Sequence, residues 1–469
     1  MRIKQISMNF VALAGTLVLG ACSCSHDATA DGGETDKPVT ENTTYPSDFN
    51  SEDEFLDYLQ KSTFDYIWDG GEPNSGLAPE RIHLDGEYPE NDKNIVTTGG
   101  SGFGIAGIVA AMDRGFISRS EGTARLRKIV DFLGSADRYH GVWSHWIDGT
   151  TGKTKPFGQK DNGGDLVESS FLMSGLLIAR EYLKDGNDTE KALAADIDKL
   201  WREMEYDWYQ NGKDVLYWHW SPDYAWEMNF PLEGYNECII TYILGAASPT
   251  HPINPEAWHK GWNRSGAIVS DKQAYGYPLV VKHNGAEEMG GPLFWAHYSW
   301  IGLDPRGLKD QYADYWQLNR NHALINYNYC KANPKGFKGY GENCWGLTAS
   351  YSTRGYMAHR PGEDVGVITP TAALSSMPYT PEESLRAAKH FYEMGSWIRG
   401  KYGFYDAFSE QDKWALPRYL AIDQLTIAPM IENHRSGLLW RLFMGAPEVQ
   451  EGLKKLGITS GTTATTTND

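Results

Sequence analysis

The sequence has few cysteines, no long apolar run beyond its first residues, and fewer bases than acids. Its five cysteines form no CxxC pair, and the chain has no HExxH motif, no dense His/Cys cluster and no GxxxxGK[ST] loop. The sequence therefore gives no support for a zinc site, a phosphate-binding loop or any other cofactor. With 43 Lys and Arg against 61 Asp and Glu, the net charge is −18. Such a surface repels phosphate backbones, which excludes nucleic acid as the main partner.

Aromatic residues are present in excess. The chain has 17 Trp, 27 Tyr and 16 Phe, or 13% of 469 residues. Aromatic side chains fill cores, and they also form flat surfaces on which sugars and other ring-shaped ligands stack. With 41% apolar and 22% charged residues the chain is globular. The composition therefore favours a folded protein with an aromatic ligand site.

The first 21 residues have the features of an export signal. Arg2 and Lys4 precede a short apolar stretch that ends in Leu19-Gly20-Ala21-Cys22. Small residues before a cysteine at this position are similar to a bacterial lipoprotein signal, with cleavage before Cys22 and lipidation of its thiol. An ordinary secretory signal with an incidental cysteine is the alternative. We expect an exported, lipid-anchored protein in the periplasm or at the outer membrane, which contacts the membrane only through its anchor.

Polar, small-residue segments flank a single predicted domain. Residues 22–49 are rich in Thr, Asp, Gly and Ser, which predicts a flexible tether, and residues 458–469 predict a disordered tail. Residues 50–457 are expected to form one catalytic domain, acting as a monomer. A disulfide between Cys330 and Cys344 is compatible with export, and their pairing stays open.

Two kinds of helix alternate through this domain. Amphipathic helices are predicted near 51–68, 119–134, 189–209, 255–263, 312–332 and 381–395, and helices apolar on nearly every side begin near 101, 165, 235, 293, 369 and 421. Six outer helices alternating with six buried ones predict an all-α (α/α)6 barrel. We expect β-hairpin insertions near 141–158 and 215–221. The glycine-rich run at 99–104 lacks a strand–helix fingerprint and indicates close helix packing.

In this topology every loop that leads into an inner helix emerges at the same rim, and acids gather there. Asp161, Asp165 and Glu168 open the second inner helix, Glu233 and Glu237 open the third, and Asp406 precedes the last. Each has a structural alternative: Asp165 as a helix cap, and Glu233 or Glu237 as a salt-bridge partner. A charge inside an apolar helix is costly unless it is paired or functional, so Glu168 is the hardest to dismiss.

Aromatic clusters lie in the loops between these acids. Sugar rings pack on indole faces, so tryptophans in the loops are candidates for contact with a carbohydrate, although about half of the loop aromatics would still be core. Two polar residues, Arg354 and His359, could hold sugar hydroxyls or be paired structurally. The predicted substrate-binding residues are the acids Asp161, Asp165, Glu168 and Glu233, with Trp143, Trp146, Trp218, Trp220, Trp226, Arg354 and His359.

Acids and aromatics at the mouth of an α-barrel indicate hydrolysis of a glycosidic bond. That reaction needs one protonated carboxyl to donate to the leaving oxygen and one ionised carboxylate to activate water or attack the sugar. The surroundings of the two groups must push their pKa values apart. Glu237, one turn inside a buried helix and beside aromatic loops, suits the acid, and Asp406, in a glycine-rich turn, suits the base.

Three segments together resemble a known family. Asp161-x-x-x-Asp165-Leu-Val-Glu168, Leu232-Glu233-Gly234-Tyr235-Asn236-Glu237 and Tyr402-Gly403-Phe404-Tyr405-Asp406 are similar to motifs of the glucoamylase-like (glycoamylase) family. Within it the resemblance is to the bacterial β-1,2-glucanases of glycoside hydrolase family 144, over about residues 50–455. The resemblance implies an (α/α)6 barrel, no cofactor and inverting hydrolysis of β-1,2-glucan. It also implies that Glu237 is the acid and Asp406 the base.

Two other classes remain open at this point. A polysaccharide lyase can use a similar toroid, but it needs Tyr/His proton transfer and usually a basic groove, which the acidic rim does not favour. A surface glycan-binding lipoprotein would keep the aromatics without a matched acid pair. The linkage, the choice between endo and exo action, and the identity of the base are not determined by these patterns.

Overall fold

The computed structural model describes residues 43–461. The chain divides into Met1–Thr43 and Thr44–Asp469, and the described helices and strands all belong to the second unit. The predicted signal peptide, the lipidation site Cys22 and residues 462–469 lie outside the described residues. Within the described range, no helix has both the length and the apolar character needed to cross a membrane.

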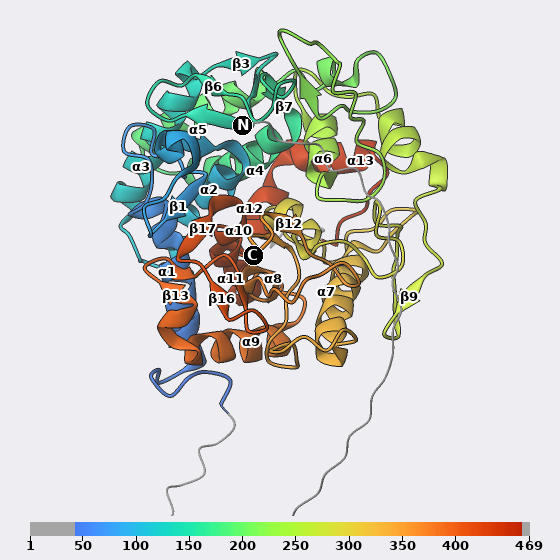
Figure 1. Ribbon diagram of the computed structural model, residues 1–469. Helices are drawn as coiled ribbons and strands as arrows, with labels where there is room; N and C mark the ends of the chain where they lie inside the picture. Colours follow the sequence, from blue (N-terminus) through green and yellow to red (C-terminus); the bar gives the residue numbers. More distant parts are fainter. Residues whose placement is uncertain (1–42, 462–469) are drawn as a thin grey trace, which may run out of the picture. The chain divides into compact units, whose positions relative to one another are not determined.

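Thirteen α-helices are found in the described part of the chain, and they alternate between amphipathic and fully buried segments as predicted. In Figure 1 α2, α4 and α10–α12 lie toward the middle of this unit, with α1, α3, α5, α7 and α9 around them. This arrangement confirms the (α/α)6 barrel. The helices are α1 (Glu52–Trp68), α2 (Thr98–Asp113), α3 (Arg119–Ser135), α4 (Leu166–Leu183), α5 (Asp188–Arg202), α6 (Ile239–Ala247), α7 (Tyr315–Ala332), α8 (Pro370–Leu374), α9 (Pro381–Glu393), α10 (Ala421–Gln424), α11 (Ile427–Arg435), α12 (Leu438–Gly445) and α13 (Pro447–Lys455).

The inner helices α2 and α4 pack closely because glycines remove side chains from their contact. A Cβ atom at Gly102 would collide with the backbone of Phe171 and Leu172 on α4, and one at Gly175 would collide with the backbone of Gly102. Glycine costs helix stability, roughly 0.5–1 kcal/mol relative to alanine, so its use here indicates a steric requirement. The prediction that the 99–104 run serves helix packing is confirmed.

Three of the predicted barrel helices are shorter than expected. The fourth outer segment has a π-helical turn at Trp258–Trp262. The fourth inner segment is two 3-10 turns at Leu293–Ala296 and Tyr298–Ile301, and the fifth inner segment, α8, has five residues. Helix α6 begins at Ile239, so the prediction that Glu237 lies inside that helix is wrong: Glu237 is in the turn before it. Helix α8 begins at Pro370, because proline favours the first position of a helix.

Short antiparallel strands line the loops. Most form two-stranded pairs, and one sheet has three strands. The pairs are β1 (Arg81–His83) with β17 (Arg418–Leu420), β3 (Arg138–Tyr139) with β4 (Val142–Trp143), β7 (Gly164–Asp165) with β8 (His219–Trp220), β9 (Gln273–Ala274) with β10 (Tyr277–Pro278), β11 (Ala349–Ser350) with β12 (Met357–Ala358), β13 (Arg399–Gly400) with β14 (Gly403–Phe404), and β15 (Phe408–Ser409) with β16 (Trp414–Ala415), and the sheet joins β2 (Ile95–Thr97), β5 (Trp146–Asp148) and β6 (Thr154–Lys155).

These strands correct one predicted hairpin and confirm the other. The segment 141–158 contains the paired strands β5 and β6, as expected. The strand near 215–221, by contrast, pairs with β7 across the chain, so Asp165 faces His219 in register. The two residues are far apart in sequence, and this pairing brings together two parts of the functional site.

Both predicted boundaries of the domain extend further. Phe49 lies in the predicted tether, but its ring packs against Phe55, Tyr58 and Tyr392 at centroid distances of 5.1–5.4 Å. Ile458 lies in the predicted tail, but it is buried, and the next residue pairs with Lys309 through backbone hydrogen bonds. The folded part therefore includes these flanking residues.

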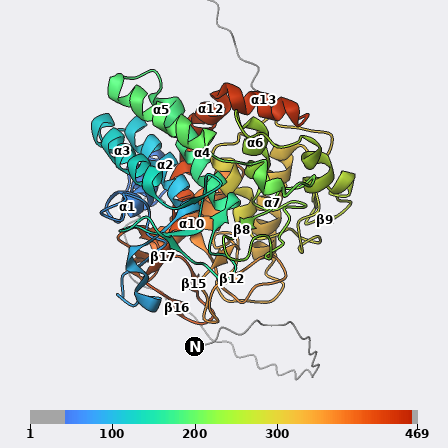
Figure 2. The same cartoon turned by 90° about the horizontal axis from the view of Figure 1, so that it is seen from above.

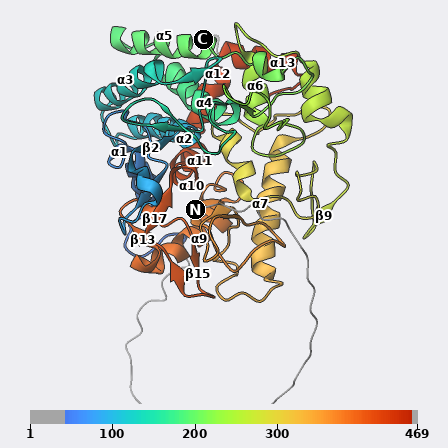
Figure 3. The same cartoon turned by 45° about the horizontal axis from the view of Figure 1, so that its top comes forward.

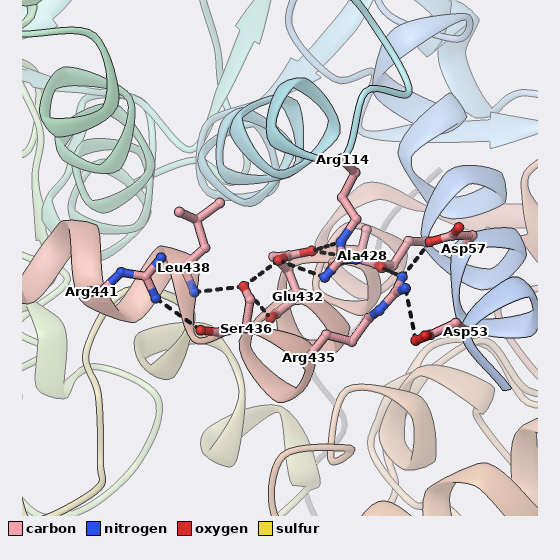
Figure 4. A network of polar contacts seen from close by, with 10 residues as sticks. Asp53, Asp57, Arg114, Ala428, Glu432, Arg435, Ser436, Leu438 and Arg441 are labelled. Atoms are coloured by element: carbon pink, nitrogen blue, oxygen red, sulfur yellow. Dashed lines mark hydrogen bonds and ion pairs between the residues drawn. The ribbon is translucent and has the colours of Figure 1, made fainter.

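A buried ion pair joins α1, α11 and the end of α2, which lie side by side in Figure 3. Figure 4 shows Glu432 of α11 accepting hydrogen bonds at 2.6 and 3.1 Å from Arg114, the residue that caps the carboxyl end of α2. Gln60 of α1 donates to the same carboxylate at 3.0 Å. Arg435 extends the network to Asp57 at 2.5 Å. Glu432 has no exposed surface, so its charge depends on these donors.

The loops that carry the candidate site lie on one side of the helices. Figure 2 shows β8, β12, β15 and β17 on one side of this unit, with α12 and α13 on the opposite side. The amino end of α2 faces the same loops, because β2 leads directly into it and pairs with β5. The helices thus provide a rigid base for a site built on loops.

Candidate active site

A cavity of about 400 Å³ lies among these loops. Three carboxylates, Glu80, Glu168 and Glu237, line it together with the cations Arg81 and His145. The rest of the lining is mostly aromatic: Trp146, Phe157, Trp218, Phe294, Tyr298, Tyr351 and Tyr356. We call this the acid cavity. Its size and its mixture of aromatic walls with a few polar groups are typical of small-molecule sites.

Glu237 borders two cavities. A second cavity of about 450 Å³, the side cavity, shares Trp218, Glu237 and Phe294 with the acid cavity. It adds polar groups from Arg264, Asn284 and Arg360, among others. A chain-like ligand that filled both spaces would therefore pass directly beside the Glu237 carboxyl, with aromatic rings on both sides of it.

The turn before α6 holds Glu237 in place from its backbone. The side-chain oxygen of Asn236 accepts the N–H of Cys238 at 3.0 Å, and the hydroxyl of Ser299 donates to the carbonyl of Glu237. Burial raises the pKa of Glu237 to about 7, and the negative charges of Glu168 and Asp165 act in the same direction. The carboxyl is therefore held near the pKa at which it can donate a proton in neutral solution.

Glu168 reaches the amino end of α2 through a gap left by glycine. Its carboxylate accepts the N–H of Gly99 at 2.8 Å, and a Cβ atom at that glycine would collide with the same carboxylate. Burial raises the pKa of Glu168 to about 7, against the opposing charge of His145. In the described part of the chain no lysine or arginine pairs with it, so its position is not that of a structural salt bridge.

Two histidines lie against the acids behind this wall. Asp165 caps α4 by accepting the N–H of Glu168 at 2.9 Å, and its other oxygen accepts from His145 Nδ1 at 3.0 Å. His219 Nε2 lies 3.3 Å from Asp161 and 3.6 Å from Asp165. Burial alone would lower the pKa of His145, but Glu168, Asp165 and Asp161 outweigh it and raise that pKa to about 9.

Asp165 is thus the N-cap of α4, as the structural alternative predicted, and this position does not exclude a functional role. Burial would raise its pKa, but the hydrogen bond from His145 and the charge of His219 outweigh burial and lower it. One ligand atom of each of His145, Asp161 and Asp165 lies close enough to the other two for the three to hold a metal ion. The direct hydrogen bond between His145 and Asp165 already accounts for their approach. Asp161 and Asp165 line neither cavity, and they act on it through His145.

Asp406 lies one layer behind the acid cavity, paired with a second carboxyl. It accepts the backbone N–H of Tyr351 at 2.7 Å. Its charge acts on Asp423, which accepts the hydroxyl of Tyr298 at 3.2 Å. In the described chain, Oδ1 of Asp406 and Oδ2 of Asp423 are buried without a hydrogen-bond partner. Burial raises the pKa of Asp406 to about 7, and burial together with the Asp406 charge holds that of Asp423 well above its usual range. Two buried carboxyls whose charges interact are harder to ionise together than singly.

Sequence reasoning missed Glu80 and the partner of Asp406. Glu80 lines the acid cavity, pairs with Arg81, and has its pKa raised by burial against that opposing charge. Its backbone carbonyl accepts the N–H of Ala421, which fixes it beside the last inner segment. No local pattern distinguishes Glu80 from a surface glutamate, because strand β17 contacts it only in the folded chain. Asp423 lies near a predicted helix start, and its position after Asp406 was the available signal.

The predicted tryptophans divide into three groups. Trp146 and Trp218 line the acid cavity. Trp220 and Trp226 lie in a separate aromatic cluster with Trp208, outside both cavity linings. Trp143 is completely buried, with its indole N–H bonded to Leu133 and Arg138 over its ring, so its prediction as a sugar contact is wrong.

The remaining predicted contacts also separate. Glu233 is exposed and lines the side cavity. His359 is fully buried, and burial lowers its pKa to about 4, so the prediction that it holds sugar hydroxyls is wrong. Arg354 is exposed in the β11–β12 loop and lines neither cavity, whereas Tyr356 from the same loop does. Cys330 and Cys344 are free thiols.

Comparison with known proteins identifies the family. The family model "Glycoamylase: Putative glucoamylase" matches residues 229–447, which include Glu237 and Asp406. An endo-β-1,2-glucanase from Chitinophaga pinensis, solved with sophorotriose and glucose, is 62% identical, covers 88% of this chain and 99% of its own, and superposes with a TM-score of 0.87. The chain belongs to the glycoamylase family.

Two further relatives show the range of the family. A structure described as a putative glucoamylase from Bacteroides caccae is 59% identical, covers 87% of this chain and 100% of its own, and has a TM-score of 0.86. An exo β-1,2-glucooligosaccharide sophorohydrolase (non-reducing end) of Parabacteroides distasonis is 45% identical over 444 residues, or 90% of this chain. This glycoamylase-family chain spans 60% of the length of that curated relative.

Proposed function

We propose that this protein is a glycoside hydrolase that cleaves β-1,2-glucan or its oligosaccharides. The observation that carries the proposal is the position of Glu237, an acid with a raised pKa on the shared wall of two aromatic cavities. The relatives named as β-1,2-glucan hydrolases, at 45% and 62% identity, support the same substrate. Glucose units on both sides of Glu237 would place the bond between them at its carboxyl.

Glu237 is the general acid of this scheme. Its proton passes to the bridging oxygen as the bond from that oxygen to the anomeric carbon breaks, and the electron pair of that bond stays on the oxygen. A group with its pKa near 7 keeps a useful protonated fraction in neutral solution and still transfers the proton readily. The neighbouring rings of Trp218 and Phe294 exclude water from this transfer.

The Asp406–Asp423 pair is the base, and it acts through Tyr298. A water molecule attacks the anomeric carbon from the face opposite the leaving oxygen and gives a proton to the Tyr298 hydroxyl, whose own proton moves to Asp423. The pair holds one proton before this step and two after it. Because water attacks directly, the product has the inverted anomeric configuration. The negative charge of Asp406 raises the proton affinity of Asp423, so Asp423 can accept the proton from Tyr298.

The cations and remaining acids of the cavity hold the substrate. Glu168 can accept from sugar hydroxyls, and the His145 ring, kept protonated by the acids behind it, can donate to them. Arg81 lies over the Trp146 ring at 5.7 Å and limits its movement. These groups account for recognition of an uncharged, hydroxyl-rich ligand in an acidic site.

Product analysis on a panel of glucans tests the proposal. Linear β-1,2-glucan should be cleaved, with laminarin and starch left intact, and the size of the products separates endo from exo action. Proton NMR at early times should show inverted anomeric products. Cleavage of starch alone would contradict the substrate, and retained configuration would contradict the mechanism. Binding of β-1,2-glucan without turnover would indicate a glycan-binding lipoprotein, and an unsaturated product absorbing in the ultraviolet would indicate a lyase.

We also propose that the mature protein is a monomer in the periplasm or at the outer membrane, anchored by lipid on Cys22. The support is the Leu19-Gly20-Ala21-Cys22 sequence after a short apolar stretch. A single acyl chain gives only marginal binding, so stable anchoring needs more than one chain. Cys22→Ala should move the protein from the membrane fraction to the soluble fraction, and persistence with membranes would contradict the anchor. Light scattering of the soluble variant measures the oligomeric state.

A further inference from the structure

Outside the two cavities, three metal-binding side chains converge from separate segments. Cys344 comes from the loop between α7 and β11, His390 from α9, and Glu410 from the β15–β16 hairpin. One ligand atom of each lies within 4.8 Å of the other two. None of the three lines the acid cavity or the side cavity. The cluster therefore needs an explanation separate from the proposed function.

Contacts within the protein do not account for this convergence. Across residues 43–461, no hydrogen bond or ion pair joins any two of these side chains or gives one of them another partner. Cys344 has only 3% of its surface exposed, and His390 and Glu410 are half-buried, so none is a freely solvated surface group. The thiol is thus an unpartnered polar group directed toward an imidazole and a carboxylate.

The acid cavity supplies a matched comparison. His145, Asp161 and Asp165 satisfy the same distance condition, but His145 donates to Asp165 at 3.0 Å and the acids also face His219 at 3.3 and 3.6 Å. Their closeness is explained by charge pairing. At Cys344 the three donors stand close together without bonding, as they would around a shared ion.

We propose that Cys344, His390 and Glu410 bind one zinc ion. Thiolate sulfur, imidazole nitrogen and carboxylate oxygen are the three donor types that zinc accepts, at about 2.3, 2.0–2.1 and 2.0–2.2 Å. Tetrahedral geometry at those lengths places the donors roughly 3.3–3.8 Å apart, so a small closure of the cluster completes the site. The thiolate and carboxylate charges balance the dication, and water takes the fourth position on the partly exposed side.

Binding must displace the proton of Cys344. An ordinary cysteine thiol has a pKa of about 8.5, so it is mostly protonated at neutral pH. Zinc binding therefore releases one proton to solvent per ion, as a metal–thiolate bond replaces the S–H bond. No oxidant or reductant takes part. The affinity should accordingly increase with pH.

The site has a structural consequence for the acid cavity. Tyr351 follows Cys344 by seven residues, and Asp406 precedes Glu410 by four, and the Tyr351 backbone donates to Asp406 at 2.7 Å. A metal at the cluster would fasten both segments to α9. Because the ion lies outside the cavities, it should stabilise the fold and leave the chemistry unchanged. The sequence contains no zinc motif at this site, because Cys344 and His390 are 46 residues apart and His390 and Glu410 are 20 residues apart, which matches no short pattern.

Metal binding to the purified full-length protein tests this directly. Protein stripped with a chelator is titrated with zinc by calorimetry in two buffers of different ionisation enthalpy, and with cadmium while sulfur-to-metal absorbance is recorded. We expect one equivalent, release of one proton, a sulfur–cadmium band and a rise in Tm. Absence of stoichiometric binding in the unaltered protein would overturn the proposal.

Variants separate this site from adventitious binding. Loss of a residue that only hydrogen bonds to a metal ligand typically costs about 10–100-fold in affinity. Cys344→Ser and His390→Ala each remove a ligand itself, so each should weaken zinc binding by at least that much. Cys344→Ser should also lose the cadmium band. Cys330→Ser, at another buried free cysteine, and His251→Ala, at a histidine elsewhere on the surface, should bind as the parent does. If Cys344→Ser does not fold, His390→Ala carries the test. Unchanged affinity in a folded His390→Ala variant would overturn the assignment.

Discussion

Two buried glutamates lie at opposite ends of α2, and their surroundings give them opposite properties. Glu168 meets the amino end of the helix through the Gly99 N–H, has no arginine or lysine beside it in the described chain, and has its pKa raised to about 7 by burial. Glu432 meets the carboxyl end through Arg114. Burial would raise its pKa too, but hydrogen bonds from Arg114, Ser436 and Gln60 outweigh burial and lower it (Figure 4).

The difference separates a carboxylate that stabilises the fold from one that is available for chemistry. A buried acid with a bidentate arginine stays ionised and cannot take up or release a proton near neutral pH. A buried acid without one is destabilising when charged, so it is kept only where another function requires it. By this criterion Glu168, Glu237 and the Asp406–Asp423 pair belong to the site, and Glu432 belongs to the scaffold.

The largest effect should follow from changing the acid at the cavity junction. Glu237→Gln removes the transferable proton and keeps the shape of the side chain, so we expect the rate on β-1,2-glucan to fall about 10²–10⁴-fold. The Tm should not decrease, because the carboxyl that the variant removes has no lysine or arginine partner in the described chain. Glu256→Gln, an exposed glutamate, is the control. Loss of folding in Glu237→Gln would show that Glu237, like Glu432, stabilises the fold.

The scaffold end should respond in the opposite way. Arg114→Ala leaves the Glu432 carboxylate buried without its cation, which typically costs about 3–5 kcal/mol of stability. We expect urea unfolding to show this loss, while kcat per folded molecule stays at the parent value. Arg127→Ala breaks partly exposed pairs with Asp131 and Asp196, each worth about 0–1 kcal/mol, and is the matched control. Equal losses in the two variants would contradict a special role for the buried pair.

Glu168→Gln should lower activity but increase stability. Folding raises the pKa of Glu168 from 4.5 to about 7. The protonated Glu168 side chain therefore contributes its full stabilisation of the folded state below pH 4.5. This stabilisation is lost as the pH rises to about 7 and is missing above that. The neutral amide avoids this loss, so the variant should gain about 3 kcal/mol of stability at pH 8 relative to pH 4.

Glu432 provides the opposite sign in the same measurement. Its folded pKa is lowered, so its contribution is present above pH 4.5 and is lost as the pH falls through the folded value. Unfolding free energies across pH 3–8 for Glu168→Gln and Glu432→Gln should therefore diverge in opposite directions. Parallel curves would contradict the assignment of the two pKa shifts.

Removal of the Tyr298 hydroxyl should affect catalysis more than binding. Tyr298→Phe cuts the link between the acid cavity and the Asp406–Asp423 pair while keeping the ring against Phe294. We expect kcat to fall roughly a hundredfold, at the lower end of general acid–base effects, with KM within about twofold. Tyr242→Phe, at a buried tyrosine that lines neither cavity, controls for loss of a hydroxyl. A change confined to KM would make Tyr298 a binding residue only.

The smallest predicted effect concerns the tryptophans. Trp218 lines both cavities, so Trp218→Ala should raise KM by roughly 2–10-fold, the value of one aromatic contact. Trp226→Ala, from the cluster outside the cavities, should leave KM unchanged. Titration with a β-1,2-glucan oligosaccharide should quench less of the fluorescence in Trp218→Ala than in Trp226→Ala. The reverse result would move the binding site to the Trp208 cluster.

The sequence predicted the barrel well because its signal is local. Each inner segment is apolar on every side, and each outer one is amphipathic, so the alternation can be read without knowing which segments touch. Glu237 was found in the same way, as a charge beside an apolar helix. The segment near 293–301 was predicted to be a helix because its composition is that of an inner helix. It forms a pair of 3-10 turns instead, and Pro292 precedes the first of them.

The parts that failed depend on contacts between distant segments. Trp143 and Trp146 are three residues apart, but only the pairing of β3 with β4 and of β2 with β5 turns the first into the core and leaves the second in the acid cavity. Glu80 reaches the cavity because β1 pairs with β17. His359 was predicted to contact sugar from its loop position, but the residue is enclosed. Strand register decides each case, and it cannot be read from one sequence.

The most direct test of the account uses the Glu237→Gln variant with two substrates. Linear β-1,2-glucan needs protonation of its leaving oxygen, whereas sophorosyl fluoride releases fluoride without it. If Glu237 is the proton donor on the wall between the two cavities, the variant should lose activity on the glucan about 10²–10⁴-fold and hydrolyse the fluoride at nearly the parent rate. Equal losses on the two substrates would contradict the role of Glu237 as general acid, and with it the separation of site carboxylates from scaffold carboxylates.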